Sequence, residues 1–209
     1  MFSINNRLLF KCILLLLSII PANLYGQTKQ DSLLKLLQAH SAKDTVRVNL
    51  LNELAYAIYP YDIEKTLEYA NESSEIAKEI DYTKGKATSL KLMGIYYLVK
   101  SNYHKSLEYN HNALKLFQEI KDKSGISKCC NNLGIIYDYR GDYCKALDYY
   151  EKSLKINTEL NDKKGIAYCL NNIASVYNSR VDYPTAIKYY KKSLKIKEEL
   201  NDKKGISKC

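Results

Sequence analysis

The sequence predicts an all-α fold in which antiparallel helix pairs stack into a solenoid, and three observations support this expectation. The stretch 122–201 is one 40-residue unit written twice, and self-similarity at such a fixed period is typical of repeat arrays. Each unit contains two runs in which apolar residues recur at the spacing of one helical face. Residues that commonly end and begin helices lie between the two runs. We therefore expect two helices per unit and no β-strand.

The two apolar runs define a helix A and a helix B in each unit. In helix A the recurring positions are Ile126, Cys130, Leu133 and Tyr137, followed in the next unit by Ile166, Leu170, Ile173 and Tyr177. In helix B they are Tyr143, Leu147, Tyr150 and Leu154, followed by Tyr183, Ile187, Tyr190 and Leu194. Gly141 is placed to end helix A. Asp142 and Asp182 are placed as N-caps of helix B, where a carboxylate accepts hydrogen bonds from the first turn.

One ordered set of residues resembles a known family: Leu133-Gly134, Tyr137, Gly141-Asp142-Tyr143, Ala146 and Tyr150. This order resembles the tetratricopeptide repeat (TPR), a helix–turn–helix unit with a usual period of about 34 residues. The additional residues here lengthen helix B, as in the long-repeat variety found in spindle-orientation scaffolds and in the sensor regions of Bacteroidota signalling proteins. The resemblance implies a TPR α-solenoid, a right-handed superhelix of antiparallel helix pairs, that binds proteins or extended peptide segments.

The first 26 residues have the pattern of a secretory signal peptide. Arg7 and Lys11 form a basic start, an apolar run covers 12–20, and a plausible cleavage site lies near Gly26. An uncleaved membrane anchor is the alternative, but the apolar run is well short of the ~20 residues that span a bilayer. We therefore expect export to a periplasm or cell surface.

The repeat register divides the rest of the chain. The expected units are a capping helix at 27–43, a divergent TPR 1 at 44–81, TPR 2 at 82–121, TPR 3 at 122–161, TPR 4 at 162–201 and the start of a TPR 5 at 202–209. The helices are expected near 28–41, 45–58, 63–80, 83–99, 103–120, 123–139, 143–160, 163–179 and 183–200. The last unit stops within its first helix, so we expect the sequence to be truncated at the C-terminus. A membrane link through the missing region stays open.

Composition argues against an enzyme. Apart from Gly26, every glycine falls in one of three repeat columns: 85/125/165/205, 94/134 and 141. None is left for a phosphate-binding loop or a nucleophile elbow. The net charge of +9 falls by two when Arg7 and Lys11 leave with the signal peptide. The remaining lysine excess is typical of a solvated outer face, and with export it favours no nucleic-acid partner.

Cysteines suggest no metal site and no other cofactor. Cys129, Cys169 and Cys209 share one repeat column, whose members neighbouring repeats hold too far apart for one ion. Adjacent Cys129 and Cys130 point about 100° apart on a helix. Small buried thiols are the default interpretation. An oxidising compartment leaves a disulfide or an intermolecular pairing open.

The candidate binding surface is the stripe of helix A that faces the inside of the superhelix, because A helices line the inner surface of stacked pairs. Its residues are Thr88, Lys91, Ile95 and Leu98 in TPR 2, Lys128, Asn131, Ile135 and Asp138 in TPR 3, and Tyr168, Asn171, Ser175 and Asn178 in TPR 4; Tyr139 is also expected to be exposed in the groove. Only Lys91 and Lys128 are basic on this face, so the ring of cations that would hold a terminal carboxylate is absent.

Asn52, Asn132 and Asn172 are expected to share one column as an asparagine ladder. An amide both donates and accepts hydrogen bonds, so two interpretations stay open. The ladder either bonds the backbone of the adjacent repeat, or it binds the main chain of an extended peptide. Asn131 and Asn171, one residue further round the helix, favour ligand contact.

The leading hypothesis is an exported TPR module that binds a protein or peptide, as the sensing part of a signal-transduction protein. A structural scaffold of the cell envelope without signalling output is the alternative. The sequence following Cys209 would separate them, because a membrane helix and an output domain support the sensor.

Overall fold

A computed structural model of the chain describes residues 29–202 and residue 205. The predicted signal peptide lies outside the described residues. Of the predicted start of TPR 5, only residues 202 and 205 are described.

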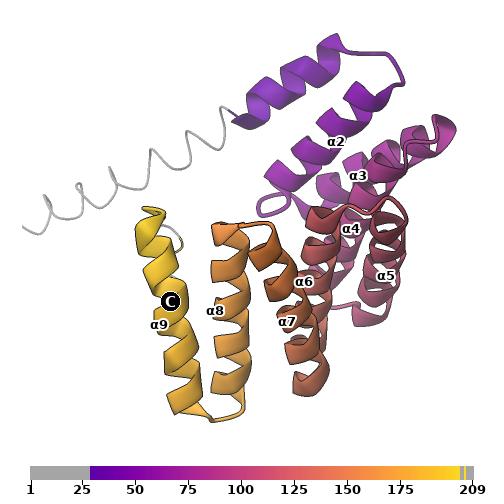
Figure 1. Cartoon of the computed structure of the whole chain (residues 1–209). Coiled ribbons are helices and arrows are strands. Elements are labelled where there is room, and N and C mark those ends of the chain that lie inside the picture. Colours follow the sequence, from indigo (N-terminus) through magenta and orange to yellow (C-terminus); the bar gives the residue numbers. More distant parts are fainter. Residues whose placement is uncertain (1–28, 203–204, 206–209) are drawn as a thin grey trace, which may run out of the picture.

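The described chain is a curved stack of helix pairs without a β-strand in residues 29–202 (Figure 1). Residues 29–39 are helical and precede eight further helices: α2 (Thr45–Ile58), α3 (Ile63–Glu79), α4 (Thr83–Val99), α5 (Tyr103–Glu119), α6 (Lys123–Tyr139), α7 (Tyr143–Glu159), α8 (Lys163–Ser179) and α9 (Tyr183–Glu199). The ranges expected for these eight agree within one residue. The prediction of an all-α solenoid is therefore confirmed.

The helices form two layers. The A helices α2, α4, α6 and α8 each contact the next A helix along the chain, which makes them the inner layer. Each of the B helices α3, α5 and α7 packs against the A helix before it and the A helix after it. This arrangement leaves one stripe of each A helix facing the inside of the curve.

The turns between helices use the residues that the sequence analysis singled out. Asp142 accepts a hydrogen bond from the backbone N–H of Lys145, and Asp182 accepts one from Thr185, so both cap helix B as expected. Gly141 follows α6 with φ at +74°, the left-handed conformation that glycine adopts without cost. Val181 stands at the same point after α8 with φ at +64°.

The A–B interface is tight at Gly134. A Cβ atom there would lie 2.6 Å from the Tyr150 ring, and Tyr150 is almost fully buried. All four residues of the predicted α7 stripe pack on the core, but Tyr150 is the one that is buried. The other buried positions of α7 are Ala146, Ser153 and Asn157. Small and polar residues take the centre of the interface because the backbones approach closely, and the larger Tyr143, Leu147 and Leu154 pack around its edge.

In α9 the same outer positions are open. Tyr183 and Ile187, both predicted to lie in the core, are about half exposed. In the described residues no following helix pair packs on α9, so nothing covers the positions that α8 covers on α7.

Candidate functional site

A cavity of about 690 Å³ lies on the inner face of the curve. All four A helices contribute to its lining, as does Lys29 in the N-terminal helical segment. Burial is the main cause of the raised pKa of Tyr168 in α8, and Asp202 and Tyr56 of α2 add to it, which places Tyr56 near Tyr168 across the curve. The cavity therefore joins residues from the first repeat to the fourth.

Part of the predicted inner stripe lines this cavity. The lining residues that the sequence predicted are Thr88, Lys91, Ile95, Lys128, Asn131, Asn132 and Tyr168. The other predicted site residues lie outside it: Leu98, Ile135, Asp138, Tyr139, Asn171, Asn172, Ser175 and Asn178. The curve of the stack explains why only some of the predicted residues line the cavity. It brings α2 opposite the first turns of α8, whereas the later turns of α6 and α8 lie outside the enclosed space.

Sequence reasoning missed the contribution of the first repeat and of the early turns of α6 and α8. The missed lining residues include Asn49, Glu53 and Tyr56 of α2, Ser124 and Ser127 of α6, Ser153 and Asn157 of α7, and Asp162, Lys164, Gly165 and Cys169 around the start of α8. The α2 residues could have been found from the repeat register, had it been assigned correctly.

Two equivalent hydrogen bonds define that register. The hydroxyl of Ser106 donates to the carbonyl of Gly94 at 2.7 Å, and the hydroxyl of Thr66 donates to the carbonyl of Ala55 at 3.3 Å. Ala55 therefore occupies the position of Gly94, and Asn52, three residues earlier, occupies that of Lys91.

The expected grouping of Asn52 with Asn132 and Asn172 was therefore wrong. The four equivalent positions of the A helices are Asn52, Lys91, Asn131 and Asn171, which we call the floor column. The first three line the cavity. Ala55 and Thr66 are 11 residues apart, whereas Gly94 and Ser106 are 12 apart, so α2 is shifted by one residue against the later repeats. In the corrected register Asn49 and Tyr56 are equivalent to Thr88 and Ile95.

The asparagines make structural hydrogen bonds. The amide of Asn52 donates to the carbonyl of Gly85 in the next repeat at 3.1 Å, as one of the two interpretations expected. Asn132 instead donates to the side chain of Asn110 at 3.1 Å, and Asn172 donates to that of Asn131 at 2.9 Å. Among the described residues, the Oδ1 atom of Asn52 is the one buried side-chain oxygen or nitrogen that has no hydrogen-bond partner.

Lys91 is the charged residue of the floor column and is only 9% exposed. Burial, and secondarily the positive charge of Lys128, lower the pKa of Lys91 to about 8. The acidic group that acts on it, Asp122, already binds the ammonium of Lys84 at 3.1 Å and the backbone N–H of Gly125 at 2.9 Å. In residues 29–202 no ion pair to Lys91 is formed.

The cysteines near the cavity are buried. Burial raises the pKa of Cys129 to about 12 and also raises the pKa of Cys130 and Cys169. All three are free thiols, as is the exposed Cys144. In the described ranges, no group of three or more His, Cys, Asp or Glu residues is arranged to hold a metal ion.

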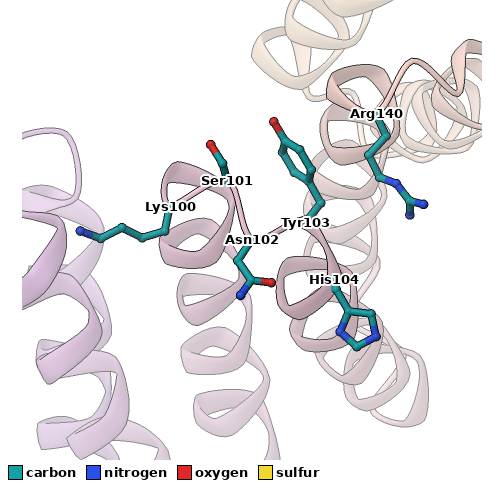
Figure 2. A pocket seen from close by; sticks show the side chains of 6 residues that line it. All are labelled: Lys100, Ser101, Asn102, Tyr103, His104 and Arg140. Atoms are coloured by element: carbon teal, nitrogen blue, oxygen red, sulfur yellow. The ribbon is translucent and has the colours of Figure 1, made fainter.

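A second depression of about 580 Å³ lies at the turn between α4 and α5. Figure 2 shows that its side chains diverge: Lys100 extends to one side, Arg140 and His104 extend to the other, and Tyr103 points away from both. No cluster of polar groups converges on one point there, so the inner cavity is the stronger candidate site. Across the part of the chain that the structure describes, no helix is both long and apolar enough to pass through a membrane.

Solved structures of other proteins share the fold. A Rap protein complexed with competence and sporulation factor gives a TM-score of 0.75 at 17% identity, over 88% of this chain and 55% of that chain. Aspartyl phosphate phosphatase F from Bacillus subtilis gives 0.73 at 16% identity, over 88% and 51%. A signal-transduction ATPase with a tetratricopeptide repeat sensor, from Pyrococcus horikoshii, gives 0.68 at 20% identity, over 83% and 28%.

At these identities the likeness shows a common fold, and the chain spans about half or less of the length of these three proteins. No curated protein sequence matches the chain. The model of the tetratricopeptide repeat family matches residues 87–159 and 145–199, which together exceed half of the sequence. The chain therefore belongs to the tetratricopeptide repeat family.

Proposed function

We propose that this protein is an exported binding module whose inner cavity holds an extended peptide segment of a partner, and that it forms the sensing part of a signal-transduction protein. The observation that carries the proposal is the cavity of about 690 Å³, to which all four A helices contribute. An elongated ligand contacts several repeats at once, and a solenoid provides such a continuous concave surface. The Rap structure, which is complexed with a factor, supports the same use of the fold.

The lining suits a peptide better than a compact cofactor. Amide, hydroxyl and ammonium groups such as Asn49, Ser124 and Lys128 are spread along it, and Tyr56 and Tyr168 provide large aromatic surfaces at the two sides. Spaced hydrogen-bonding groups fit the regular donors and acceptors of an extended main chain. Tyrosine rings add contact area at low entropic cost.

Binding is tested by passing a mixture of random twelve-residue peptides over the purified, immobilised protein and sequencing what is retained. Lys128→Ala combined with Tyr168→Ala should abolish retention, because both side chains are exposed and line the cavity. The matched control is Lys115→Ala with Tyr183→Ala, which removes an exposed lysine and an exposed tyrosine outside the cavity. Equal retention by both double variants, with unchanged circular dichroism, would place the binding surface elsewhere.

Export has its own test. The basic start with Arg7 and Lys11, the apolar run and the site near Gly26 support cleavage by a signal peptidase. When the full chain is expressed in a bacterial host with two membranes, the protein should appear in the periplasmic fraction, and N-terminal sequencing should begin at Gln27. A protein that stays in the cytoplasm and begins at Met1 contradicts this part of the proposal.

A further inference from the structure

We propose that the cavity selects peptides that carry an internal Asp or Glu residue, whose carboxylate binds between Lys91 and Lys128. This inference rests on the proposed peptide-binding function and names the ligand chemistry that the site takes. It depends on the lysine that one repeat of the floor column has where the other three have asparagine.

The position of Lys91 is the first ground. Its side chain lines the cavity and is nine-tenths buried, in a column where the other repeats place Asn52, Asn131 and Asn171. A buried ammonium without a counter-ion costs stability, and burial is the main cause of its lowered pKa. A lysine at this point is explained if a ligand supplies the missing negative charge.

The charges around Lys91 favour an anion. From α6, Lys128 repels Lys91, Asp122 is already engaged by Lys84, and the thiol of Cys129 is neutral. From α2, Glu53 lines the same cavity without forming an ion pair to Lys91 in the described residues, and it is exposed. Asp162 at the start of α8 also lines the cavity and accepts a hydrogen bond from the backbone N–H of Gly165. In the described residues none of these carboxylates forms an ion pair to Lys91 or Lys128, so a carboxylate placed between the two ammonium groups would attract both.

Asn52 provides an independent observation. Its Oδ1 atom is buried and has no hydrogen-bond partner, and it belongs to the same floor column, one repeat before Lys91. A buried acceptor without a donor costs about as much as a lost hydrogen bond. The main-chain N–H of a residue next to the acidic one, after a small adjustment of the amide, would satisfy it.

The extent of the cavity indicates whether the bound carboxylate belongs to an internal acidic side chain or to the C-terminus of the peptide. The lining continues on both sides of Lys91, to Tyr56 on α2 and to Tyr168 on α8. A terminal carboxylate bound at Lys91 would leave one of these sides empty. An internal side chain lets the peptide occupy both.

The test uses the same random twelve-residue mixtures, one pool with free C-termini and one with amidated C-termini. The expected result is enrichment of Asp and Glu among retained peptides from both pools. Lys91→Gln should retain peptides without that enrichment, and Lys115→Gln, which removes a lysine outside the cavity, should keep it. Enrichment confined to the free-acid pool would overturn the internal residue in favour of a terminus. Retention without acidic enrichment would overturn the inference and leave the proposed function standing, and no retention at all would refute both.

A double-mutant cycle gives the decisive measurement. For one enriched peptide, we expect Lys91→Gln in the protein and Glu→Gln in the peptide each to weaken binding about tenfold, and the two together to weaken it no further, since both remove one charge-assisted hydrogen bond. Additive effects would show that the two groups do not meet.

Affinity for the acidic peptide should be constant from pH 6 to 7 and fall as the pH rises through about 8, where free Lys91 loses its proton. The Gln peptide should show no such fall.

Discussion

The second and third repeats place different residues at the same point of the groove floor, Lys91 in one and Asn131 in the other. Asn131 accepts a hydrogen bond from Asn172 and so ties its repeat to the next one. Lys91 makes no ion pair in the described residues and is more deeply buried. The same column therefore holds Asn131, which stabilises the stack, and Lys91, whose buried charge lowers its stability.

This difference shows how a repeat protein can acquire specificity. The fold needs each repeat to supply the small residues of the A–B contact and the helix caps, and repeats two and three both do so at Gly94 and Gly134. Positions on the inner stripe are not required by the contact with helix B, so they vary between repeats at a cost that the remaining array can tolerate. Residues that lower stability without a structural partner are then candidates for ligand contacts.

The largest expected effect is a gain in stability when the second repeat is made like the third. At pH 7 the folded protein holds a charged Lys91 whose pKa lies near 8 instead of its ordinary 10.5, and this difference corresponds to about 3 kcal/mol against folding. Lys91→Asn should therefore raise the free energy of unfolding at pH 7 by up to about 3 kcal/mol in urea titrations.

The sign of the pH dependence checks the cause. Between about pH 8 and 10.5 the unfolded chain binds the proton that the folded chain has lost, so wild-type stability should rise with pH and the advantage of Lys91→Asn should shrink. Lys91→Met, which keeps the length of the side chain, should show the same gain. A gain that does not depend on pH would mean that charge burial is not the reason.

The next largest effect concerns the contact that the repeats share. Gly134→Leu should lower the free energy of unfolding by about 1–3 kcal/mol, because its Cβ would lie 2.6 Å from the ring of the buried Tyr150. The control is Lys152→Ala on the outer helix, which should leave the melting temperature nearly unchanged. Equal melting temperatures for the two variants would refute the tight contact.

Helices α4–α9 could be predicted from the sequence almost to the residue because the 40-residue period repeats their caps and their core positions. Gly141 and Asp142 mark the same turn that Val181 and Asp182 mark one unit later. The first repeat was harder, because one residue fewer separates Ala55 from Thr66 than separates Gly94 from Ser106, and the grouping of Asn52 depends on this shift. Only the hydrogen bonds of Thr66 and Ser106 settle the alignment.

The candidate site was predictable only in part. Periodicity identifies the inner face of each helix A, and this found Lys91, Lys128, Asn131 and Tyr168. The curvature of the stack depends on how whole helices pack, and no local pattern encodes it. It decides that Tyr56 and Tyr168 share a cavity while Ser175 does not.

A smaller effect is expected at the turn that ends α8. Val181 has φ at +64°, where a β-branched residue is strained by about 1–2 kcal/mol, and the third repeat has Gly141 at the same point with φ at +74°. Val181→Gly should raise the free energy of unfolding by about 1 kcal/mol. The reciprocal change Gly141→Val should lower it by a similar amount. Destabilisation by both variants would mean that the Val181 side chain contributes packing that outweighs its backbone strain.

The smallest effect is expected from the ion pairs that join the start of helix A to the end of helix B. In the third repeat the ammonium of Lys123 lies 2.8 Å from the carboxylate of Glu159, and the fourth repeat pairs Lys163 with Glu199 at 2.9 Å. The second repeat has Thr83 at the equivalent position, and its helices keep the same lengths.

Lys123→Thr makes the third repeat like the second at this point. We expect no measurable change in melting temperature, because both groups of the pair are exposed and water screens them. The measurement is a thermal melt at low and at high salt, with Lys164→Thr, which removes an exposed lysine from the first turn of α8, as the control for the loss of a positive charge. A clear loss of stability confined to Lys123→Thr at low salt would show that these pairs help to hold helix A against helix B within a repeat.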